Sequence, residues 1–454
     1  MEKINILMPQ GVKIIIDTLK GEGYKGYIVG GCVRDSLLKK HPKDWDITTD
    51  SLPEKTMEIF KARGFRVVET GLKHGTVTIV INKIGYEVTT FRIEGGYSDN
   101  RHPDYVSYTT SIKEDLSRRD FTVNAMAYNE DSGLIDYFGG TEDLNNKIIK
   151  TVGKAEDRFN EDALRMLRAV RFSSQLGFQL DTKDLFISIK RNAELIKNIS
   201  QERIREELSK ILVSDEPVDG IIALKESGLL QYIIPELNPT IDFEQHNKHH
   251  DKDVFNHTLA VLDNVPNKLE LRLAALLHDI GKPKCFTIGE DKQGHFYGHN
   301  EVSAQISRKV LKRLRFDNKT INKVSLLVFE HMSKFDKIKL PAIKRFINRV
   351  GEENLEDLFQ LQIADVKGSA KRSQDTSKIL DLREKCEIIL NEKQPLTIKD
   401  LAVNGGDLMN LGIKEGKEVG TTLNMLLEKI LERPELNTKE SLSEIILKRR
   451  IEND

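Results

Sequence analysis

Cysteine is scarce in this chain of 454 residues, which has only Cys32, Cys285 and Cys386. Their number is odd and they lie far apart, which excludes a disulfide framework and predicts a reducing, cytoplasmic environment. Long apolar runs are also missing. The sequence therefore predicts neither a secretory signal peptide nor a membrane-spanning helix.

An excess of charge of one sign is missing as well. The 70 basic residues balance the 71 acidic ones, for a formal net charge of -1. A nucleic-acid partner is neither required nor excluded, and local basic clusters would have to bind it. Only 6% of the residues are aromatic and 39% are hydrophobic, which is typical of a soluble globular protein. The length predicts roughly three domains.

Strand and helix patterns divide the chain unequally. Short β-branched runs at 26–31, 76–82 and 86–92 predict strands, and 52–65 predicts a helix that a glycine ends. From about Leu144 onward the strand patterns cease and helical periodicity continues. We therefore expect an α+β fold, in which a small mixed head precedes an all-helical remainder. The expected segments are 1–143 for the head, 144–240 for a neck and body, 241–372 for a third unit and 373–454 for a tail.

The segment YIVGGCVRDSLLKKHPKDWDITT, residues 27–49, contains the densest group of candidate functional residues. Gly30 and Gly31 follow a predicted strand, where glycine lets backbone N–H groups approach a phosphate. Arg34 lies where a helix would begin and could bind the same triphosphate. Asp44 and Asp46 are one residue apart, so on a strand both carboxylates would face the same side.

Two converging carboxylates repel each other unless a cation lies between them. Mg²⁺ prefers such hard oxygen ligands, and Glu87 supplies a third carboxylate on a neighbouring predicted strand. Metal ions bound by Asp44, Asp46 and Glu87 could activate an attacking hydroxyl and stabilise a pyrophosphate leaving group. The glycine pair alone would be explained by an ordinary turn, and the aspartate pair alone by an exposed loop. Neither explanation accounts for both pairs at this spacing.

The motifs GGCVRD and DWDITT resemble those of the class II nucleotidyltransferases, which include the bacterial CCA-adding enzymes and poly(A) polymerases. RRDFTVNAMAYN at 118–129 and GLIDYFGGTEDL at 133–144 extend the likeness. The resemblance implies a polymerase-β-like head, Mg²⁺ as cofactor, and a nucleotide contact at Arg119. Without the family, RRDF is simply a charged helix cap.

The segment EDALRMLRAVRF, residues 161–172, places a charged residue at every third position. On a helix these side chains would form one stripe, which could also be an ordinary salt-bridge ladder. An aspartate accepts hydrogen bonds and an arginine donates them, so a coplanar pair selects the base edge that cytosine and adenine share. By resemblance Asp162 and Arg165 read the base, while Arg168 and Arg171 support them. QERIREELSKIL, residues 201–212, matches a neck motif to which we assign a structural role only.

Two further stretches favour CCA addition over poly(A) synthesis. ETGLKHGTVTIVI at 69–81 is similar to the CCA-adding version and lacks the basic, aromatic segment of the poly(A) polymerases. The polar segment 94–108 resembles the mobile loop that CCA-adding enzymes need to change from CTP to ATP, and Arg101–Asp104 is the part expected to move. An enzyme that adds only the terminal A, with a C-adding partner, remains an alternative.

A third group of residues follows the order of the HD superfamily, H…HD…D. Histidine and carboxylate ligands on facing helices suit a divalent transition metal. The resemblance implies a metal site, with hydrolysis of a phosphoester as an open question, and makes an HD phosphohydrolase the alternative main activity. The ligands it implies are His257, His278, Asp279 and Asp365, with His299 and His331 in matching order.

The resemblance implies tRNA as the partner, bound at its acceptor stem and elbow, with CTP and ATP as substrates. LAVNGGDLMNLGIKEGKEVG in the tail carries glycine turns whose N–H groups could contact phosphates, although an ordinary helical hairpin explains it equally well. We expect no membrane and no DNA partner. A purely structural RNA-binding protein is a weaker hypothesis. A protein that only binds RNA gains nothing from two carboxylates placed beside a phosphate.

Overall fold

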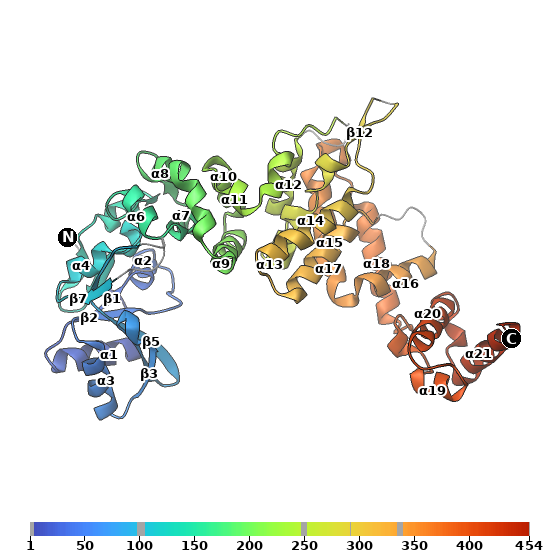
Figure 1. Cartoon of the computed structure of the whole chain (residues 1–454), viewed down its shortest axis with the longest axis horizontal. Coiled ribbons are helices and arrows are strands. Elements are labelled where there is room, and N and C mark those ends of the chain that lie inside the picture. The colour runs from blue at the N-terminus through green and yellow to red at the C-terminus, as the bar shows by residue number, and fades with distance from the viewer. Residues whose placement is uncertain (1–3, 98–104, 247–251, 291, 334–338, 454) are drawn as a thin grey trace. The chain divides into compact units, whose positions relative to one another are not determined.

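The computed structural model describes residues 4–97, 105–246, 252–290, 292–333 and 339–453. The chain divides into two compact units, Met1–Asn238 and Pro239–Asp454 (Figure 1). The finer division into four segments stays a prediction. Across these described ranges, no helix is both long and apolar enough to cross a membrane.

A seven-stranded sheet forms the centre of the first unit. Its order is β3-β4-β5-β2-β1-β8-β9. All neighbouring strands are antiparallel except β2 and β5, which run parallel. The strands are β1 (Gly26–Val29), β2 (Ile47–Thr49), β3 (Arg66–Gly71), β4 (Thr76–Ile81), β5 (Ile84–Thr90), β8 (Met126–Asn129) and β9 (Gly133–Asp136).

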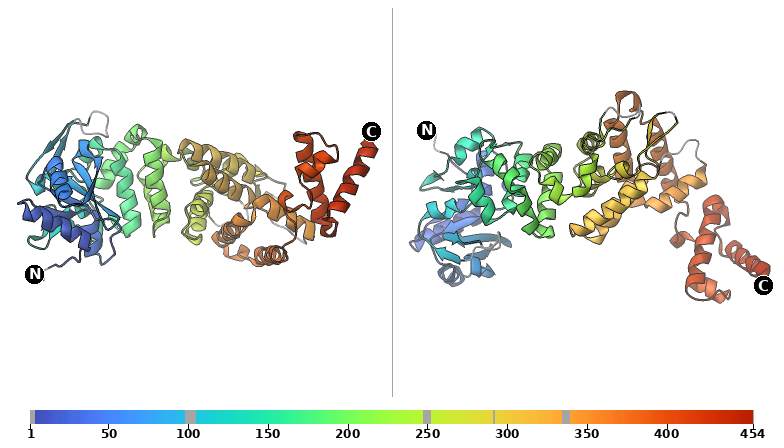
Figure 2. Two further views of the ribbon diagram at one scale, coloured as in Figure 1. Left: turned by 90° about the horizontal axis from the view of Figure 1, so that it is seen from below. Right: turned by 45° about the horizontal axis from the view of Figure 1, so that its top comes forward.

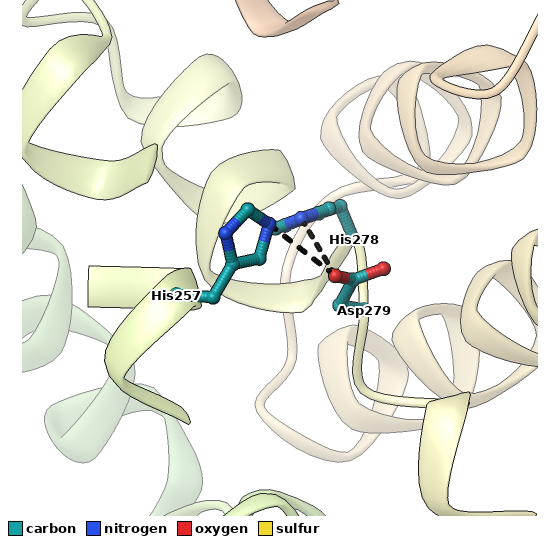
Figure 3. Close-up of side chains that lie close together, drawn as sticks. All are labelled: His257, His278 and Asp279. Atoms are coloured by element: carbon teal, nitrogen blue, oxygen red, sulfur yellow. Dashed lines mark ion pairs between the residues drawn. The ribbon is translucent and has the colours of Figure 1, made fainter. Parts of the chain in front are cut away.

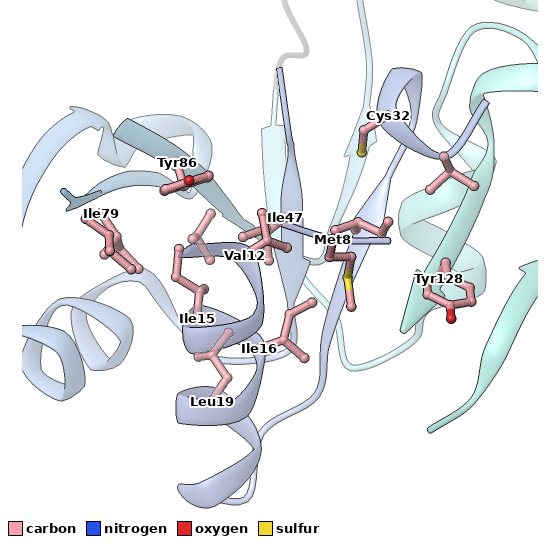
Figure 4. Packing of buried hydrophobic residues seen from close by; sticks show 14 of the residues in the cluster. Met8, Val12, Ile15, Ile16, Leu19, Cys32, Ile47, Ile79, Tyr86 and Tyr128 are labelled. Atoms are coloured by element: carbon pink, nitrogen blue, oxygen red, sulfur yellow. The ribbon is translucent and has the colours of Figure 1, made fainter. Parts of the chain in front are cut away.

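One face of this sheet is covered by α1 (Gln10–Gly21) and α3 (Pro53–Ala62). Apolar residues recur on α1 at helical spacing, and Val12, Ile15 and Leu19 point at the sheet (Figure 4). They pack with Ile47 and Ile79 in one buried cluster, which fixes the helix on the sheet. The opposite face carries a smaller core that includes Tyr27, Val29, Phe91 and Leu116.

The rest of the first unit is mostly helical. Its helices are α2 (Gly31–Leu37), α4 (Ile112–Ser117), α5 (Gly140–Asn145), α6 (Ala155–Glu161), α7 (Leu164–Leu176), α8 (Leu185–Asn192), α9 (Gln201–Leu212), α10 (Pro217–Glu226) and α11 (Leu230–Ile233). α7 packs against α9 and α10. Two short pairs supplement the sheet: β6 (Arg92–Gly95) with β7 (Tyr105–Tyr108), and β10 (Ile148–Ile149) with β11 (Gln179–Leu180).

The second unit is built of helices (Figure 2). α12 packs against α17, and α14 packs against α15. The helices are α12 (Val254–Asn264), α13 (Leu269–Leu277), α14 (His299–Arg313), α15 (Asn318–Glu330), α16 (Leu340–Val350), α17 (Glu352–Gly368), α18 (Ser377–Asn391), α19 (Gly405–Asn410), α20 (Lys417–Glu432) and α21 (Lys439–Asn453). One short hairpin, β12 (Thr287–Ile288) with β13 (Gly294–His295), interrupts them.

The α+β fold is as predicted, and the expected strands and helices of the head are present. The expectation that no strand follows Leu144 was wrong in detail, because the pairs β10–β11 and β12–β13 form later in the chain. Each of these strands has only two residues, which is too short for a periodic pattern to reveal.

Replacing Ile28 by Ala should destabilise the first unit by about 2–5 kcal/mol, because a fully buried side chain leaves a cavity. Ile28 lies in register between Ile47 and Tyr128. The matched control is Ile84→Ala, whose side chain is 56% exposed in the same sheet and should change stability by less than about 0.5 kcal/mol. The only tryptophan, Trp45, packs against this core, so its fluorescence during urea unfolding reports the comparison. Equal losses for both variants would contradict the assigned core.

Candidate functional site

Asp46 and Glu87 lie side by side at the sheet. The parallel register pairs Ile47 of β2 with Val88 of β5, so the residues that precede each are level with one another. On β5, Val88 is buried and Glu87 is exposed, as alternation along a strand requires. Ile47 is buried, and Asp46 just before it is exposed. Val29 of β1 donates its N–H to the carbonyl oxygen of Asp46 at 3.0 Å, which anchors that residue to the sheet.

Asp44 lies just upstream and is exposed. The prediction that both aspartates stand on a strand was wrong, because β2 begins only at Ile47. β1 ends at Val29 and the chain turns into α2 at Gly31, so no backbone partner on that side continues the pairing beyond Asp46. The aspartates therefore belong to the loop that enters the strand.

The electrostatics of these carboxylates fit a bound cation. Partial burial raises the pKa of Glu87, and the negative charges of Asp46 and Asp44 raise it further. The pKa of Asp46 is also raised, because the surrounding residues partly desolvate its carboxylate and Asp44 adds a negative charge nearby, although Arg119 opposes the shift. Groups that resist ionisation because of one another release that cost when a cation binds. Hard oxygen donors of this kind match Mg²⁺.

Gly30 brings the backbone close to Arg119. Its φ of +76° lies in the left-handed region, which other residues adopt at a cost in free energy. A Cβ added at Gly30 would lie 2.9 Å from Nη1 of Arg119, so a larger residue would displace the guanidinium. Gly31 begins α2, and its added Cβ would lie 3.7 Å from Nη2 of Arg34. The structure therefore gathers the predicted glycines and both arginines in one place.

Arg34 is buried and held by neighbouring side chains. Its guanidinium donates to Oδ1 of Asn124 at 2.6 Å and to Oδ1 of Asp35 at 2.8 Å. Its Cζ lies 5.1 Å from the ring centroid of Phe172, within range of a cation–π contact. These contacts fix the direction in which the positive charge points.

Arg119 is less completely engaged. Its Nη2 lies 3.7 Å from Oδ2 of Asp115, and its Nε is buried without a hydrogen-bond partner among the described residues. Burial lowers the pKa of Arg119, while the nearby Asp115 and Asp46 favour its charged form. A buried donor without a partner costs free energy, which an anionic ligand would recover.

Asp162 differs from the prediction. It does not lie on α7 with the three arginines, because its backbone is extended between α6 and α7, at φ -144° and ψ 106°. Its Oδ1 accepts the N–H of Leu164 at 3.0 Å and so caps the start of α7. Its Oδ2 accepts from Nη2 of Arg203 on α9 at 2.7 Å, and Oδ1 lies 3.3 Å from Nη1 of the same residue.

The three arginines of α7 are all paired, with different partners. Arg165 forms an ion pair with Glu161 and donates to the carbonyl oxygen of Arg118. Arg168 donates from Nε to Oδ2 of Asp120 at 2.8 Å, and Arg171 donates to Glu207. The salt-bridge ladder within one helix is therefore replaced by contacts that join α7 to other elements.

Three of these partners were missed in the sequence. Arg203 and Glu207 lie in the neck motif, which was given a structural role only, and Asp120 was given no role of its own. Burial would raise the pKa of Asp120, but Arg168 outweighs it and lowers the pKa to about 2. The contacts join residues 36 to 48 positions apart, so no local pattern could have revealed them.

The second unit brings all six predicted HD residues into one cluster. Figure 3 shows three of them, His257, His278 and Asp279. They come from five helices or from the residues that directly flank them. These are His257 on α12, His278 and Asp279 after α13, His299 at the start of α14, His331 after α15 and Asp365 on α17.

The cluster centres on Asp279. Its Oδ2 lies 3.5 Å from Nε2 of His257 and 3.2 Å from Nε2 of His278. Oδ1 of Asp365 lies 3.0 Å from Nε2 of His257 and 3.9 Å from Nε2 of His278. These four residues are the predicted ligand set, and their donor atoms converge.

Close packing makes this cluster possible. Gly281, two residues after Asp279, carries no Cβ, and one added there would lie 2.7 Å from the backbone nitrogen of Ser303 on α14. Lys282 places Nζ 2.7 Å from Oδ2 of Asp279. Burial would raise the pKa of Asp279, but His278 and Lys282 hold it well below its usual range. Burial lowers the pKa of His331 to about 3, so this ring is neutral, as a metal ligand must be.

Two sequence segments are only partly described. Of the loop 94–108, residues 98–104 with Arg101–Asp104 lie outside the described residues, and β6 and β7 flank them. Of the polar, histidine-rich segment HNKHHDKDVFNH at 246–257, residues 247–251 also lie outside them.

The tail segment is described in full. The N–H groups of Gly406 and Asp407 donate to Oδ1 of Asn404, so the helix cap already satisfies both.

Comparison with known families gives three matches along the chain. The family model of the poly A polymerase head domain matches residues 26–150. The model of an RNA and SrmB-binding site of polymerase A matches residues 177–241. The model of tRNA nucleotidyltransferase domain 2 matches residues 296–446.

Named relatives agree with these matches. A CCA-adding enzyme of Lactiplantibacillus plantarum is 47% identical over 49% of this chain, an alignment that spans only 54% of that relative. One of Lactobacillus delbrueckii subsp. bulgaricus is 34% identical over 95% of this chain and 96% of its own length. The crystal structure of a Bacillus stearothermophilus CCA-adding enzyme in complex with CTP superposes with a TM-score of 0.71, at 30% identity, over 98% of this chain and 99% of that one. By its motifs, its fold and this nearly full-length likeness, the chain belongs to the family of CCA-adding enzymes.

Proposed function

We propose that this chain adds CCA to the 3′ end of tRNA from CTP and ATP, without a nucleic-acid template. One observation carries the proposal. The β2–β5 register sets Asp46 beside Glu87. Arg119 lies near enough to Asp46 to lower the pKa of its carboxyl, and its guanidinium also lies against the backbone of Gly30. Carboxylates for a metal thus adjoin cations for phosphates, as transfer of a nucleotide requires.

Asp44, Asp46 and Glu87 would hold Mg²⁺, which supplies positive charge for the α-phosphate and the departing pyrophosphate. The mutual repulsion of these carboxylates supports this role. Gly30 and Gly31 would let the backbone approach the triphosphate, and Arg119 would offer it the Nε that has no partner among the described residues. Arg34, fixed by Asn124 and Asp35, would add a second positive charge.

The reaction exchanges a phosphoanhydride bond for a phosphodiester bond. The oxygen of the RNA 3′-hydroxyl attacks the α-phosphorus of CTP or ATP and loses its proton to solvent. The bond between the α-phosphorus and the bridging oxygen breaks, and pyrophosphate leaves. Placing both reactants at the carboxylates supplies the orientation that the uncatalysed reaction lacks.

The neck would select the nucleotide. Asp162 and Arg165 would form hydrogen bonds with the edge that cytosine and adenine share. Arg203 grips the Asp162 carboxylate through two nitrogens and fixes its plane, which makes it a positioning residue. Arg168 and Arg171, each paired with a carboxylate of another segment, would keep α7 in place.

We assign the tRNA partner to the neck and tail. The family model of an RNA-binding site covers residues 177–241, and the resemblance of the tail supports a contact toward the tRNA elbow. The acceptor stem would then present its 3′ end to the carboxylates. An enzyme that adds only the terminal A is the alternative of the same class.

The buried cluster around Asp279 favours a second function, metal-dependent hydrolysis of a phosphoester. Imidazole and carboxylate donors in one buried cluster match a divalent transition metal such as Mn²⁺, Ni²⁺ or Zn²⁺. Such a metal supplies a water nucleophile at neutral pH. His257, His278, Asp279 and Asp365 would hold it, and the finding of six suitable residues in one place carries the proposal.

The two functions should separate by mutation. Asp46→Asn should lower CMP addition to a tRNA lacking CCA by at least about a thousandfold, because several kcal/mol of charge stabilisation are lost. Hydrolysis of p-nitrophenyl phosphate with Mn²⁺ or Ni²⁺ should persist. His278→Asn should do the reverse, since Asn can still donate to the carbonyl oxygen of Ala275 but lacks Nε2. The control is Asp17→Asn, an exposed carboxylate on α1.

Full addition by Asp46→Asn would refute the role of that carboxylate. Absence of metal-dependent hydrolysis in every variant, including the unchanged chain, would refute the second function and leave the first intact.

Arg203→Ala should relax nucleotide selection rather than abolish chemistry. Without its clamp the Asp162 carboxylate can rotate, so KM for CTP and ATP should rise about tenfold or more, while kcat falls less. UMP misincorporation should increase in the same variant, and Arg203→Lys should restore part of the selectivity. Arg205→Ala is the matched control, because Arg205 lies on the same helix and pairs with Glu206. A loss of kcat with unchanged selectivity would contradict the positioning role.

A further inference from the structure

A cavity of about 250 Å³ lies in the second unit, where α17 and α18 meet Ser333, which follows α15. Its walls include the apolar side chains of Val366, Ile379 and Leu382, all of them buried. Neither of the two proposed functions uses these residues. A volume of this size is below that of most drug-sized ligand sites, but it admits a single heterocycle.

Gln362 contributes a buried acceptor to this cavity. Its Nε2 donates to the carbonyl oxygen of Ser333 at 3.0 Å and to that of Glu330 at 3.3 Å. Because carbonyl oxygens only accept, these contacts assign the orientation of the amide and turn Oε1 away from them, toward the cavity. Gln362 is 2% exposed, and its Oε1 has no hydrogen-bond partner among the described residues. A donor on a ligand would recover the free energy that such a buried acceptor costs.

Ser333 supplies a second acceptor beside the first. Its Oγ donates its proton to Oε2 of Glu330 at 2.5 Å, so a ligand in the cavity would meet the lone pairs of this hydroxyl. Glu330 is in turn paired with Arg349, whose guanidinium donates to both of its carboxylate oxygens. Gln362 and Ser333 therefore offer the cavity acceptors, and the carboxylate behind them is neutralised.

The charged residues of the cavity also balance. Asp375 and Lys378 both line it, both are exposed, and they carry opposite charges. A charged ligand would gain no net attraction from them and would lose its hydration between the apolar walls. A neutral ring with apolar faces fits these surroundings, provided that its edge carries N–H donors for the two acceptors.

We propose that this cavity binds a neutral, amino-substituted heterocycle of nucleobase size, which makes it a site for an adenine or cytosine nucleoside. The exocyclic amino group of these bases carries two N–H donors, which match Oε1 of Gln362 and Oγ of Ser333. A carbonyl oxygen at the same ring position would face those acceptors with a third one and be rejected. The inference goes beyond both proposed functions and depends on neither, so its failure would leave them intact.

Adenosine and purine riboside form a matched pair of probes, because purine riboside lacks only the amino group. Each is titrated into the full-length chain in a calorimeter. Adenosine should bind with a Kd on the order of 0.1 mM, as expected for a ligand of its size. Purine riboside should bind at least about tenfold more weakly, because both acceptors stay unpaired. Photolabelling with 8-azidoadenosine and peptide mapping should modify residues 362–382 rather than 161–172.

Substitutions on α18 locate the binding. Leu382→Trp fills the cavity and should abolish adenosine binding in the second unit. Leu380→Trp is the matched control, since Leu380 lies on the same helix but is 47% exposed, and it should leave the Kd unchanged. Circular dichroism checks that each variant is folded, and Ile379→Phe replaces Leu382→Trp if that variant is not.

Three results would overturn the proposal. The first is an absence of adenosine binding, which would leave water as the only occupant of the cavity. The second is equal affinity for adenosine and purine riboside, which would refute the role of the two acceptors. The third is binding that survives in the folded Leu382→Trp chain, or labelling confined to residues 161–172, which would assign the nucleoside to the neck.

Discussion

The parallel pairing of β2 with β5 is the constraint on which the head depends. It is the one parallel contact in the seven-stranded sheet, and it sets Ile47 opposite Val88. A shift of β2 by one residue against β5 would turn Asp46 toward the apolar face that α1 and α3 cover, away from Glu87. The buried apolar residues on that face therefore determine where the carboxylates project, and the register that stabilises the fold also builds the site.

In the neck, ion pairs between residues far apart in the sequence fix the site in a similar way. Arg168, Arg171 and Asp162 each meet an opposite charge from a different segment, namely Asp120, Glu207 and Arg203. Removing one partner of such a buried pair leaves the other uncompensated, which costs more than the pair contributes. The pairs therefore restrict how α7 can move relative to its neighbours, and a surface that reads a base by hydrogen bonds needs that rigidity.

The sequence predicted the α+β class, the main strands of the head and the residues that converge at Asp279. Those predictions rest on local patterns or on family motifs, which a single sequence contains. It could not predict where β2 begins, because that depends on β1 ending at Val29, nor the partners of the neck arginines. It also gave Asp162 a place on α7, whereas the carboxylate caps that helix and pairs with Arg203. Each incorrect or missing prediction concerns a contact between segments that are distant in the sequence, and such contacts are determined by tertiary packing. The roles of the individual site residues stay predictions.

The measurement that tests the central claim most directly uses a tRNA transcript that lacks its terminal CCA. The unchanged chain receives Mg²⁺ with CTP alone, with ATP alone and with both nucleotides, and the 3′ ends are sequenced. The account predicts that CTP alone adds CC, and that both together add CCA and nothing further. Addition only to a tRNA that already ends in CC, a long A tail, or no addition at all would contradict it.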